Sequence, residues 1–173
     1  MFTNLKADIE RNLRDYEPCG TLKRIALCLS LNSIHALALI RFQQWCARNH
    51  LPTIFAAKLL FWFFKIEISR KASIGPGLRL PHPMGLIIAP NVEIGPGCDL
   101  YADVRLVLSH GNPQGPRLGA GVFMGDGAKA VGAVTIGENS VIGVSSVVTK
   151  DIPANVTAVG IPTKIIAEGI TRT

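Results

Sequence analysis

The sequence predicts a mainly β protein, a parallel β-helix preceded by a short α-helical region. Two observations carry this prediction. An aliphatic or similarly small residue returns every six positions between residues 68 and 148, whereas residues 4–64 show apolar spacing typical of helices. A period of six is not a multiple of the 3.6-residue helical repeat, and an isolated flat strand alternates with a period of two.

The six-residue repeat runs in two blocks, one before and one after a break. Each unit is expected to form a short strand and a turn, and three units close one triangular coil, so residues about 18 apart should stack. The repeating positions then fill the interior of a prism as a ladder. These positions are Ile68, Ile74, Leu80, Leu86, Val92, Cys98, Val104, Leu118, Met124, Ala130, Ile136, Ile142 and Val148.

The break between the two blocks predicts a loop extruded from one corner of the prism. Val104 and Leu118 are 14 residues apart, two more than two repeats, and the segment 109–117 has the Gly, Pro, Ser and Asn content of a loop. Loops that project from rigid scaffolds often carry function. A tolerated insertion is the alternative interpretation.

The residues before the repeat predict three helices, over 4–15, from Leu22 to about Asn49, and from about 54 to Phe64. The expected organisation is a helical region 1–66, a β-helix 67–166 with the extruded loop 109–117, and a polar tail 167–173. The third helix is the most apolar stretch and is too short to span a bilayer, which needs about 20 apolar residues. We expect it to pack between the other helices and the first coil, with contact to a membrane surface as the alternative.

Composition excludes some classes of function. The chain has 173 residues, 48% of them hydrophobic, and a net charge of +6, but its Lys and Arg form no basic run, so nucleic acid is not expected as a partner. Cys19, Cys28, Cys46 and Cys98 lack C-x-x-C spacing and indicate reduced thiols. The N-terminus alternates charged residues where a signal peptide needs an apolar stretch, so we expect a cytoplasmic protein.

His82 is the candidate catalytic residue. It lies between Pro81 and Pro83, which restrict the backbone around it, and Glu67 lies fifteen residues earlier, close to one coil below. A carboxylate beside an imidazole orients the ring and stabilises the imidazolium, as a general base requires. The alternative is an ordinary surface histidine.

At these residues the chain resembles the hexapeptide-repeat acyltransferases, and among them the serine O-acetyltransferases and related O-acetyltransferases. The resemblance runs from about Glu67 to Val104 and from Leu118 to Ile166. It implies a left-handed β-helix, a homotrimer, and acetyl-CoA as co-substrate in the groove between two prisms. It also implies a His82 base with Glu67 as its partner, and no metal. By the same resemblance, the cofactor-binding residues are Asp126, Val144, Ser146 and Lys164, in the segments 124–129, 142–148 and 160–164.

The departures from this family fall on the acceptor side. Pro81 stands where the family has an Asp before the catalytic His, and Gln114-Gly115 stands where it has Arg-His. His110 and Arg117 are the residues that this sequence offers for substrate binding instead. The resemblance implies an acetyl-CoA-dependent O-acetyltransferase, with L-serine or a related hydroxyl compound as the small-molecule acceptor.

Two alternative functions were weighed. A sugar or exopolysaccharide O-acetyltransferase would suit the short helical region and its apolar third helix. A β-helix without transferase activity, such as a carbonic anhydrase-like protein, would need three His ligands for a metal. Only His82 and His110 lie in or beside the predicted prism, which argues against that class.

Overall fold

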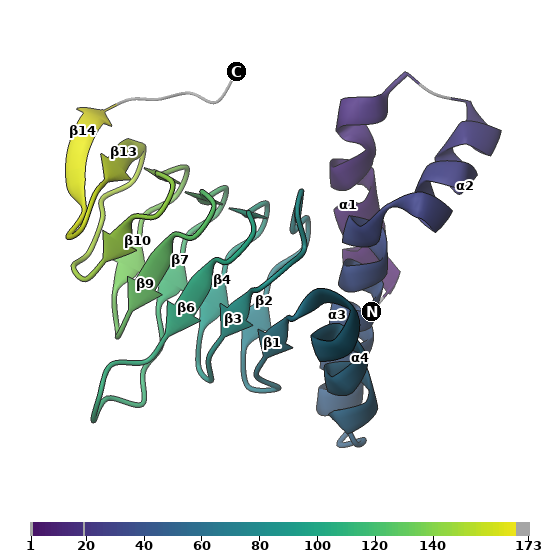
Figure 1. The fold of residues 1–173 in the computed structure, drawn as a ribbon, viewed down its shortest axis with the longest axis horizontal. Coiled ribbons are helices and arrows are strands. Elements are labelled where there is room, and N and C mark those ends of the chain that lie inside the picture. Colours follow the sequence, from purple (N-terminus) through teal and green to yellow (C-terminus); the bar gives the residue numbers. More distant parts are fainter. Residues whose placement is uncertain (1, 19, 169–173) are drawn as a thin grey trace.

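A computed structural model of the protein describes residues 2–18 and 20–168. It has a helical region at one end of a parallel β-solenoid, and the polypeptide winds away from the helices toward its C-terminal part (Figure 1). The helices are α1 Phe2–Leu13, the 3-10 turn Arg14–Tyr16, α2 Thr21–Ser30, α3 Asn32–Arg48 and α4 Ile54–Phe64.

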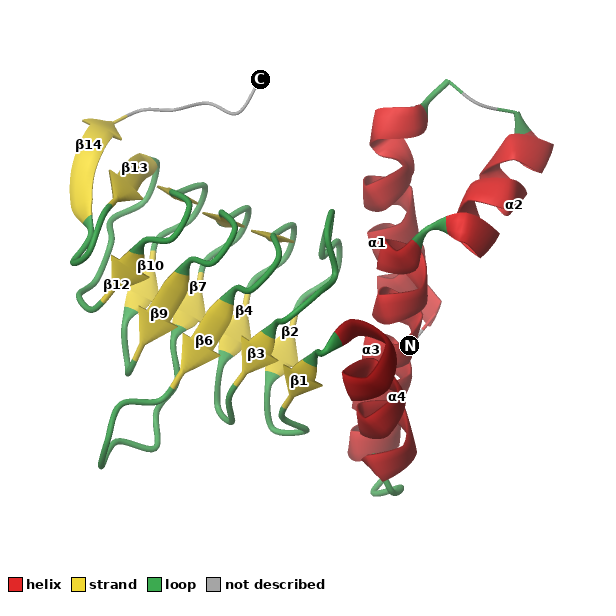
Figure 2. Ribbon diagram, in the orientation of Figure 1, coloured by secondary structure: helices red, strands yellow, loops and turns green. Residues whose placement is uncertain are grey.

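The solenoid is made of three sheets whose strands are mostly two or three residues long (Figure 2). We call them sheet A, in the order β1-β3-β6-β9-β12, sheet B, β2-β4-β7-β10, and sheet C, β5-β8-β11-β13-β14. All neighbours are parallel except β13 and β14. The strands are β1 Glu67–Ile68, β2 Ser73–Ile74, β3 Ile87–Ile88, β4 Glu93–Ile94, β5 Asp99–Leu100, β6 Arg105–Val107, β7 Arg117–Leu118, β8 Phe123–Met124, β9 Lys129–Val131, β10 Thr135–Ile136, β11 Val141–Ile142, β12 Val147–Val148, β13 Val156–Val159 and β14 Lys164–Glu168.

The predicted ladder is buried, and Ile68, which is half-buried, is its one partly exposed member. The interior holds two inward rows, two residues apart in each repeat. One row lies on the strands and includes Ile88, Ile94, Leu100 and Leu106. The other lies at the corners that precede the strands and includes Leu86, Val92, Cys98 and Val104. Side chains of both rows make one continuous hydrophobic core.

The predicted 18-residue coil is wrong at three places. Ile68 pairs with Ile88, twenty residues later, and Ile94 pairs with Leu118, twenty-four residues later. The first coil therefore has two extra residues, in the turn before β3, and the third coil has six, between β6 and β7. Leu80 belongs to the row that lies on the strands. The residue six positions later, Leu86, therefore belongs to the row that lies at the corners. In the last coil, Ile142 pairs with Ala158, sixteen residues later, so two residues are missing between β12 and the bridge at Ile152.

The six extra residues form the extruded loop, which projects from the corner between sheets A and B (Figure 2). It comprises residues 108–116, between β6 and β7. The prediction of a loop here is confirmed, but its C-terminal boundary was one residue too late. Arg117 belongs to β7, where it pairs with Glu93 and Thr135 in the register of sheet B.

The predicted helix from Leu22 to Asn49 is two helices that meet at a 72° bend. Leu31 is extended at the break, with φ −81° and ψ 117°. The polar run of Ser30, Asn32 and Ser33 supplies side chains that compete for helical backbone groups, and the Ser30 hydroxyl donates to the Leu27 carbonyl. Among described residues, α3 buries eight side chains and α2 buries none, so packing on the solenoid fixes only α3.

The helical region closes the open lower edge of the first coil with buried polar groups. Asp8 receives two bonds from Arg41, 2.7 and 2.9 Å long, and a third from the Leu78 N–H. Arg41 also donates to the Ile74 and Gly75 carbonyls, and Asn12 bonds both the N–H of Leu80 and the carbonyl of Leu78. The edge of sheet B and the adjoining turn are thereby satisfied, as buried backbone groups must be.

The remaining predictions for the helices and termini have mixed outcomes. One side of helix α4 packs on α3 and β1, as expected, whereas most of its remaining surface is exposed. Ala167 and Glu168, predicted to open a polar tail, belong to β14, whereas residues 169–173 lie outside the described part of the chain. Cys28 and Cys46 are free thiols, the Cys98 thiol donates to the Gly119 carbonyl, and Cys19 lies outside the described residues.

None of the helices in the described part of the chain is by itself long and apolar enough to cross a bilayer. Helices α2 and α3 together meet that test in length and composition, but they are bent relative to each other.

Candidate active site

One corner of the solenoid, between sheets C and A, contains four of the eight predicted site residues, His82, Asp126, Val144 and Ser146. We call it the His82 corner, formed by residues 81–86, 101–104, 125–128, 143–146 and 160–163 of successive coils. Backbone hydrogen bonds join its levels, from the Asp103 N–H to Met84, from Gly127 to Ala102 and from Ser145 to Asp126. His82 thus lies at the foot of a ridge whose upper levels carry Asp126, Val144 and Ser146.

The backbone around His82 is held by its neighbours. The Met84 N–H donates to the His82 carbonyl over 2.8 Å, and Pro83 is buried. Gly85 ends the turn at φ +71°, where a Cβ would collide with the Asp103 carboxylate. Glycine is therefore required three residues after His82 for this turn to stack under the next one.

The His82 ring is exposed and lies against an aromatic column. It meets Tyr101 edge-on, with ring centroids 6.1 Å apart and an interplanar angle of 65°. Tyr101 in turn lies 5.0 Å from the ring of Phe123. Such edge contacts restrain the direction of the imidazole while leaving its nitrogens accessible.

His82 opens into a cavity of about 320 Å³ between the solenoid and the helical region. Its wall is neutral: none of the residues that line it is Asp, Glu, Lys or Arg. The polar groups come from the break between α2 and α3 and from the 3-10 turn. The lining residues are Tyr16, Ser30, Leu31, Asn32, Ser33, Phe63, Phe64, Pro81, His82, Pro83 and Met84.

Glu67 lies near this corner but faces a different hollow. Its N–H donates to the Leu86 carbonyl, which places β1 directly below β3. The exposed carboxylate borders a hollow of about 420 Å³ over sheet A, together with Ala57 and Ile87. Among the described residues, no hydrogen bond or ion pair joins Glu67 to His82. The pairing of these two residues stays a prediction.

His110 and Arg117 lie at another corner of the same chain. His110 is exposed in the extruded loop between sheets A and B. The Arg117 guanidinium lies 3.3 Å from the Glu93 carboxylate on the outer face of sheet B, and both side chains are exposed. One chain alone therefore does not bring either residue to His82.

The four predicted cofactor-binding residues differ in how exposed their side chains are. Val144 is exposed on the ridge, Asp126 is half-buried, and Lys164 is exposed in β14. Ser146 points into the core, where its hydroxyl accepts the Gly160 N–H over 2.9 Å. Its side chain thus fixes the closing turn, and only its main chain lies at the ridge.

Sequence reasoning missed Tyr101 and the polar cavity lining from Tyr16, Asn32 and Ser33. Tyr101 was hidden because an 18-residue coil places residue 100 above His82. The true 20-residue spacing, marked by the bridge between Arg79 and Asp99, brings Tyr101 and Ala102 there. No local signal links the helical residues to His82, because their contact depends on how α1 and α3 pack on the first coil.

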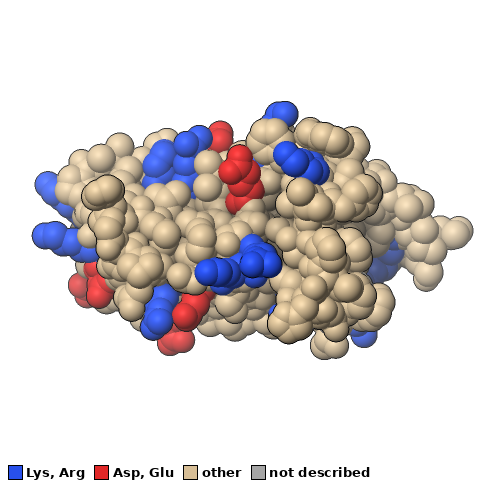
Figure 3. Space-filling model, turned by 90° about the horizontal axis from the view of Figure 1, so that it is seen from below, with Lys and Arg blue, Asp and Glu red and all other residues tan. Residues whose placement is uncertain are grey.

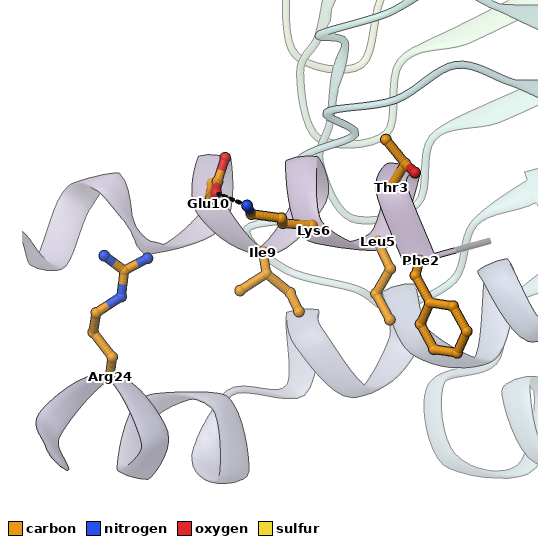
Figure 4. A pocket seen from close by; sticks show the side chains of 7 residues that line it. All are labelled: Phe2, Thr3, Leu5, Lys6, Ile9, Glu10 and Arg24. Atoms are coloured by element: carbon orange, nitrogen blue, oxygen red, sulfur yellow. Dashed lines mark ion pairs between the residues drawn. The ribbon is translucent and has the colours of Figure 1, made fainter. Parts of the chain in front are cut away.

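Another hollow lies away from His82, between α1 and α2 (Figure 4). It measures about 590 Å³ and has an apolar wall of Phe2, Leu5 and Ile9, with the Lys6–Glu10 ion pair at its edge. Its charged side chains are already paired, Lys6 with Glu10 and Arg24 with Glu17. In the part of the chain that the structure describes, no cluster of His, Cys, Asp and Glu is arranged to hold a metal ion.

Comparison with known proteins supplies the family. No family model matches the chain. The serine acetyltransferase of Helicobacter pylori strain 26695 is 35% identical over 169 residues, which cover 95% of this chain and 98% of that enzyme.

Solved structures agree with this relationship. Serine acetyltransferase from Brucella abortus in complex with coenzyme A has a TM-score of 0.83 and 29% identity. The Neisseria gonorrhoeae enzyme in complex with serine has a TM-score of 0.83 and 27% identity. The Brucella abortus match covers 96% of this chain and the Neisseria gonorrhoeae match covers 94%; each covers 68% of the solved chain. Identity at this level over nearly the whole chain, together with the same solenoid and N-terminal helices, establishes that the chain belongs to the serine acetyltransferase family.

Proposed function

We propose that this protein transfers an acetyl group from acetyl-CoA to the hydroxyl of a small molecule, with His82 as general base. The observation that carries the proposal is the position of the His82 ring. It is exposed, held edge-on by Tyr101, and open to a cavity large enough for a small acceptor. The relatives named serine acetyltransferase, and the complex of one such enzyme with coenzyme A, support this activity.

The reaction needs one base and no covalent enzyme intermediate. The acceptor hydroxyl gives its proton to the His82 imidazole as its oxygen attacks the thioester carbonyl carbon. The tetrahedral intermediate then collapses, the C–S bond breaks, and the departing thiolate takes the proton from the imidazolium. The products are the O-acetyl ester and coenzyme A, and the histidine returns to its neutral form.

Acetyl-CoA is proposed to lie along the His82 corner. Its pantetheine arm would follow the ridge past Asp126 and Val144, with the backbone at Ser146, and Lys164 would lie toward the nucleotide phosphates. The described ridge suits an extended chain because its turns stack at successive levels and expose main-chain groups. Glu67 is proposed to orient the imidazole, which requires a rotation of its exposed side chain toward the corner.

We further propose a homotrimer, because the site of one chain lacks the predicted acceptor-binding residues. The extruded loop with His110 projects from a corner other than that of His82. In a ring of three prisms with parallel axes, this loop can reach the His82 corner of a neighbour. His110 and Arg117 would then complete the acceptor site between subunits.

The acceptor is either L-serine, as the family suggests, or a neutral hydroxyl compound such as a sugar. The cavity favours the neutral compound. A free amino acid carries an ammonium and a carboxylate, and burying either without a partner costs several kcal/mol. Within one chain, the cavity wall has no charged residue, and Pro81 supplies no carboxylate.

The test is thiol release from acetyl-CoA with L-serine and with a panel of monosaccharides and polyols. We expect turnover that depends on acetyl-CoA and His82, and a higher kcat/KM for a neutral hydroxyl compound than for L-serine. A value for L-serine of about 10⁴ M⁻¹s⁻¹ or more would assign serine as the acceptor and overturn the neutral-acceptor proposal. The absence of acceptor-dependent thiol release across the panel would count against acetyl transfer itself.

A further inference from the structure

Helix α4 presents an apolar surface that the fold leaves uncovered. Three residues one turn apart, Ala56, Leu60 and Phe64, are buried against α3 and β1. Most of the remaining surface is exposed and largely aromatic. We call the exposed surface of the helix the α4 face, formed by Ile54, Phe55, Phe61, Trp62 and Phe63, which are 67, 68, 39, 65 and 71% exposed. Phe63 lies at the border of this surface, close to the buried side. Exposed apolar patches of this kind mark interaction surfaces in folded proteins.

The segment that contains α4 is also basic, although two of its cations are paired with acidic residues of the preceding segment, Arg41 with Asp8 and Arg24 with Glu17. Residues 18–66 include six Lys and Arg and no Asp or Glu. The other twelve basic residues of the chain equal its twelve acidic ones, so the net charge of +6 resides in this segment. Seen from below, the helical end shows basic and uncharged atoms, and acidic atoms lie toward the solenoid (Figure 3).

Two lysines border the α4 face. Lys58 is exposed within it, and the Lys65 ammonium lies 5.0 Å from the centre of the Phe61 ring. Exposed aromatic side chains beside lysines are the composition of helices that lie in the interface of a bilayer, where the rings reach the acyl boundary and the cations meet lipid phosphates. At 11 residues, α4 is long enough to lie in that plane and too short to cross it.

We propose that the α4 face binds the surface of a membrane that contains anionic phospholipids. A second copy of the chain is the less suitable occupant, because a symmetric contact places the same surface on both sides. Lysines would then face lysines, with no acidic residue of the 18–66 segment to pair them. Anionic phospholipid supplies the missing negative charge and an apolar layer together.

The proposed contact also has a consequence for the site. Phe63 belongs to the α4 face and to the wall of the His82 cavity. A molecule bound through α4 would hold the mouth of this cavity near the lipid headgroups. The proposal does not depend on which acceptor the enzyme uses, and its test needs no substrate.

The experiment is flotation of the purified full chain with vesicles of phosphatidylcholine alone or of phosphatidylcholine mixed with phosphatidylglycerol. We expect binding to the mixed vesicles, weakened by salt, and little binding to phosphatidylcholine alone. The double variant Phe55→Ser/Trp62→Ser and the double variant Lys58→Glu/Lys65→Glu should each lower the affinity about tenfold or more. Circular dichroism and thermal unfolding would establish that these surface variants keep their fold.

The matched control is Ile165→Ser/Ile166→Ser, which removes exposed aliphatic residues from β14, outside the basic segment. It should leave vesicle binding unchanged. In a Trp45→Phe background, the emission of Trp62, then the one tryptophan of the chain, should shift to shorter wavelength with mixed vesicles.

Three outcomes would overturn the proposal. The first is no binding to either kind of vesicle, and the second is equal loss of binding in the β14 control. The third is a change in oligomeric state of Phe55→Ser/Trp62→Ser by sedimentation, which would assign the α4 face to contact between copies of this chain.

Discussion

At the scale of single residues, His82 is defined by its surroundings. Proline on both sides, a glycine three residues later and the edge of the Tyr101 ring fix its direction without covering it. His82 could be singled out from the sequence, because the flanking prolines and the following glycine are local sequence features. The Tyr101 contact and the cavity were not visible, because they depend on a coil that is two residues longer than the repeat.

His82→Ala should lower kcat about 100- to 10,000-fold, the usual range for loss of a general base, with little change in acetyl-CoA affinity. Steady-state thiol release and coenzyme A binding would measure the two effects. Glu67→Gln should lower kcat less. His35→Ala, at an exposed position of α3, is the matched control, and wild-type turnover by His82→Ala would refute the assignment of the base.

The Asp8–Arg41 pair contributes to stability rather than to chemistry. Both side chains are almost fully buried, and their hydrogen bonds extend to backbone groups of the first coil. Removal of one partner leaves the other charge buried and unpaired. The two residues are 33 positions apart, so no local sequence pattern predicted that they would pair.

Asp8→Ala or Arg41→Ala should therefore lower the free energy of unfolding by about 3–5 kcal/mol, measured by urea denaturation. Lys6→Ala is the matched control, since it removes an exposed ion pair of the same helix and should change stability by about 0.5 kcal/mol or less. Equal effects of the buried and exposed substitutions would contradict this account.

At the scale of elements, the sequence predicted the repeat and its largest interruption, the extruded loop, and missed the smaller interruptions. The solenoid and both inward rows follow from six-residue periodicity. The two-residue insertion before β3 escaped notice because both rows are aliphatic there, so counting from Leu80 to Leu86 still met a buried residue. The break at Leu31 escaped because the apolar spacing continues through it, and the bend comes from packing on the first coil.

We expect that the extruded loop can be shortened without unfolding the solenoid, and its length allows a deletion that tests this. Leu106 and Leu118 are twelve residues apart, so removal of residues 109–114 restores a spacing of one six-residue repeat. We expect this deletion variant to fold with nearly unchanged stability, because the six removed residues are exposed or half-buried. The buried Gly115 and Pro116 remain and continue into β7.

The same deletion should lower kcat/KM for the acceptor, because the loop is proposed to complete the acceptor site, and leave coenzyme A binding intact. Thermal unfolding and steady-state kinetics measure the two properties separately. His110→Ala tests one side chain of the loop by itself. Full activity of the deletion variant would mean that the loop is only a tolerated insertion.

At the scale of the whole molecule, different parts of the chain have different proposed roles. The solenoid presents the base and the ridge, the helical region closes the first coil and supplies the cavity wall, and the α4 face lies at the helical end. The extruded loop points away from the cavity of its own chain. The proposed acceptor site, with His110 and Arg117, therefore requires a second chain, and this requirement is the main reason to propose a trimer.

A mixture of two inactive variants tests that requirement. His82→Ala has a loop but no base, whereas the chain without residues 109–114 has a base but no loop. In a cyclic trimer, a site that takes its base from one subunit and its loop from the next is intact only between a deletion subunit and a His82→Ala subunit. Random assembly from equal amounts makes about one site in four intact.

Co-expression of the two variants should therefore restore about a quarter of the wild-type activity per chain, although each alone has little. Sedimentation would verify that the mixed species is a trimer. A mixture that remains as inactive as its components, while mixed trimers are present, would show that base and loop do not serve one site from different subunits. The acceptor site would then have to be built within each chain, from the neutral cavity that His82 shares with the α2–α3 break.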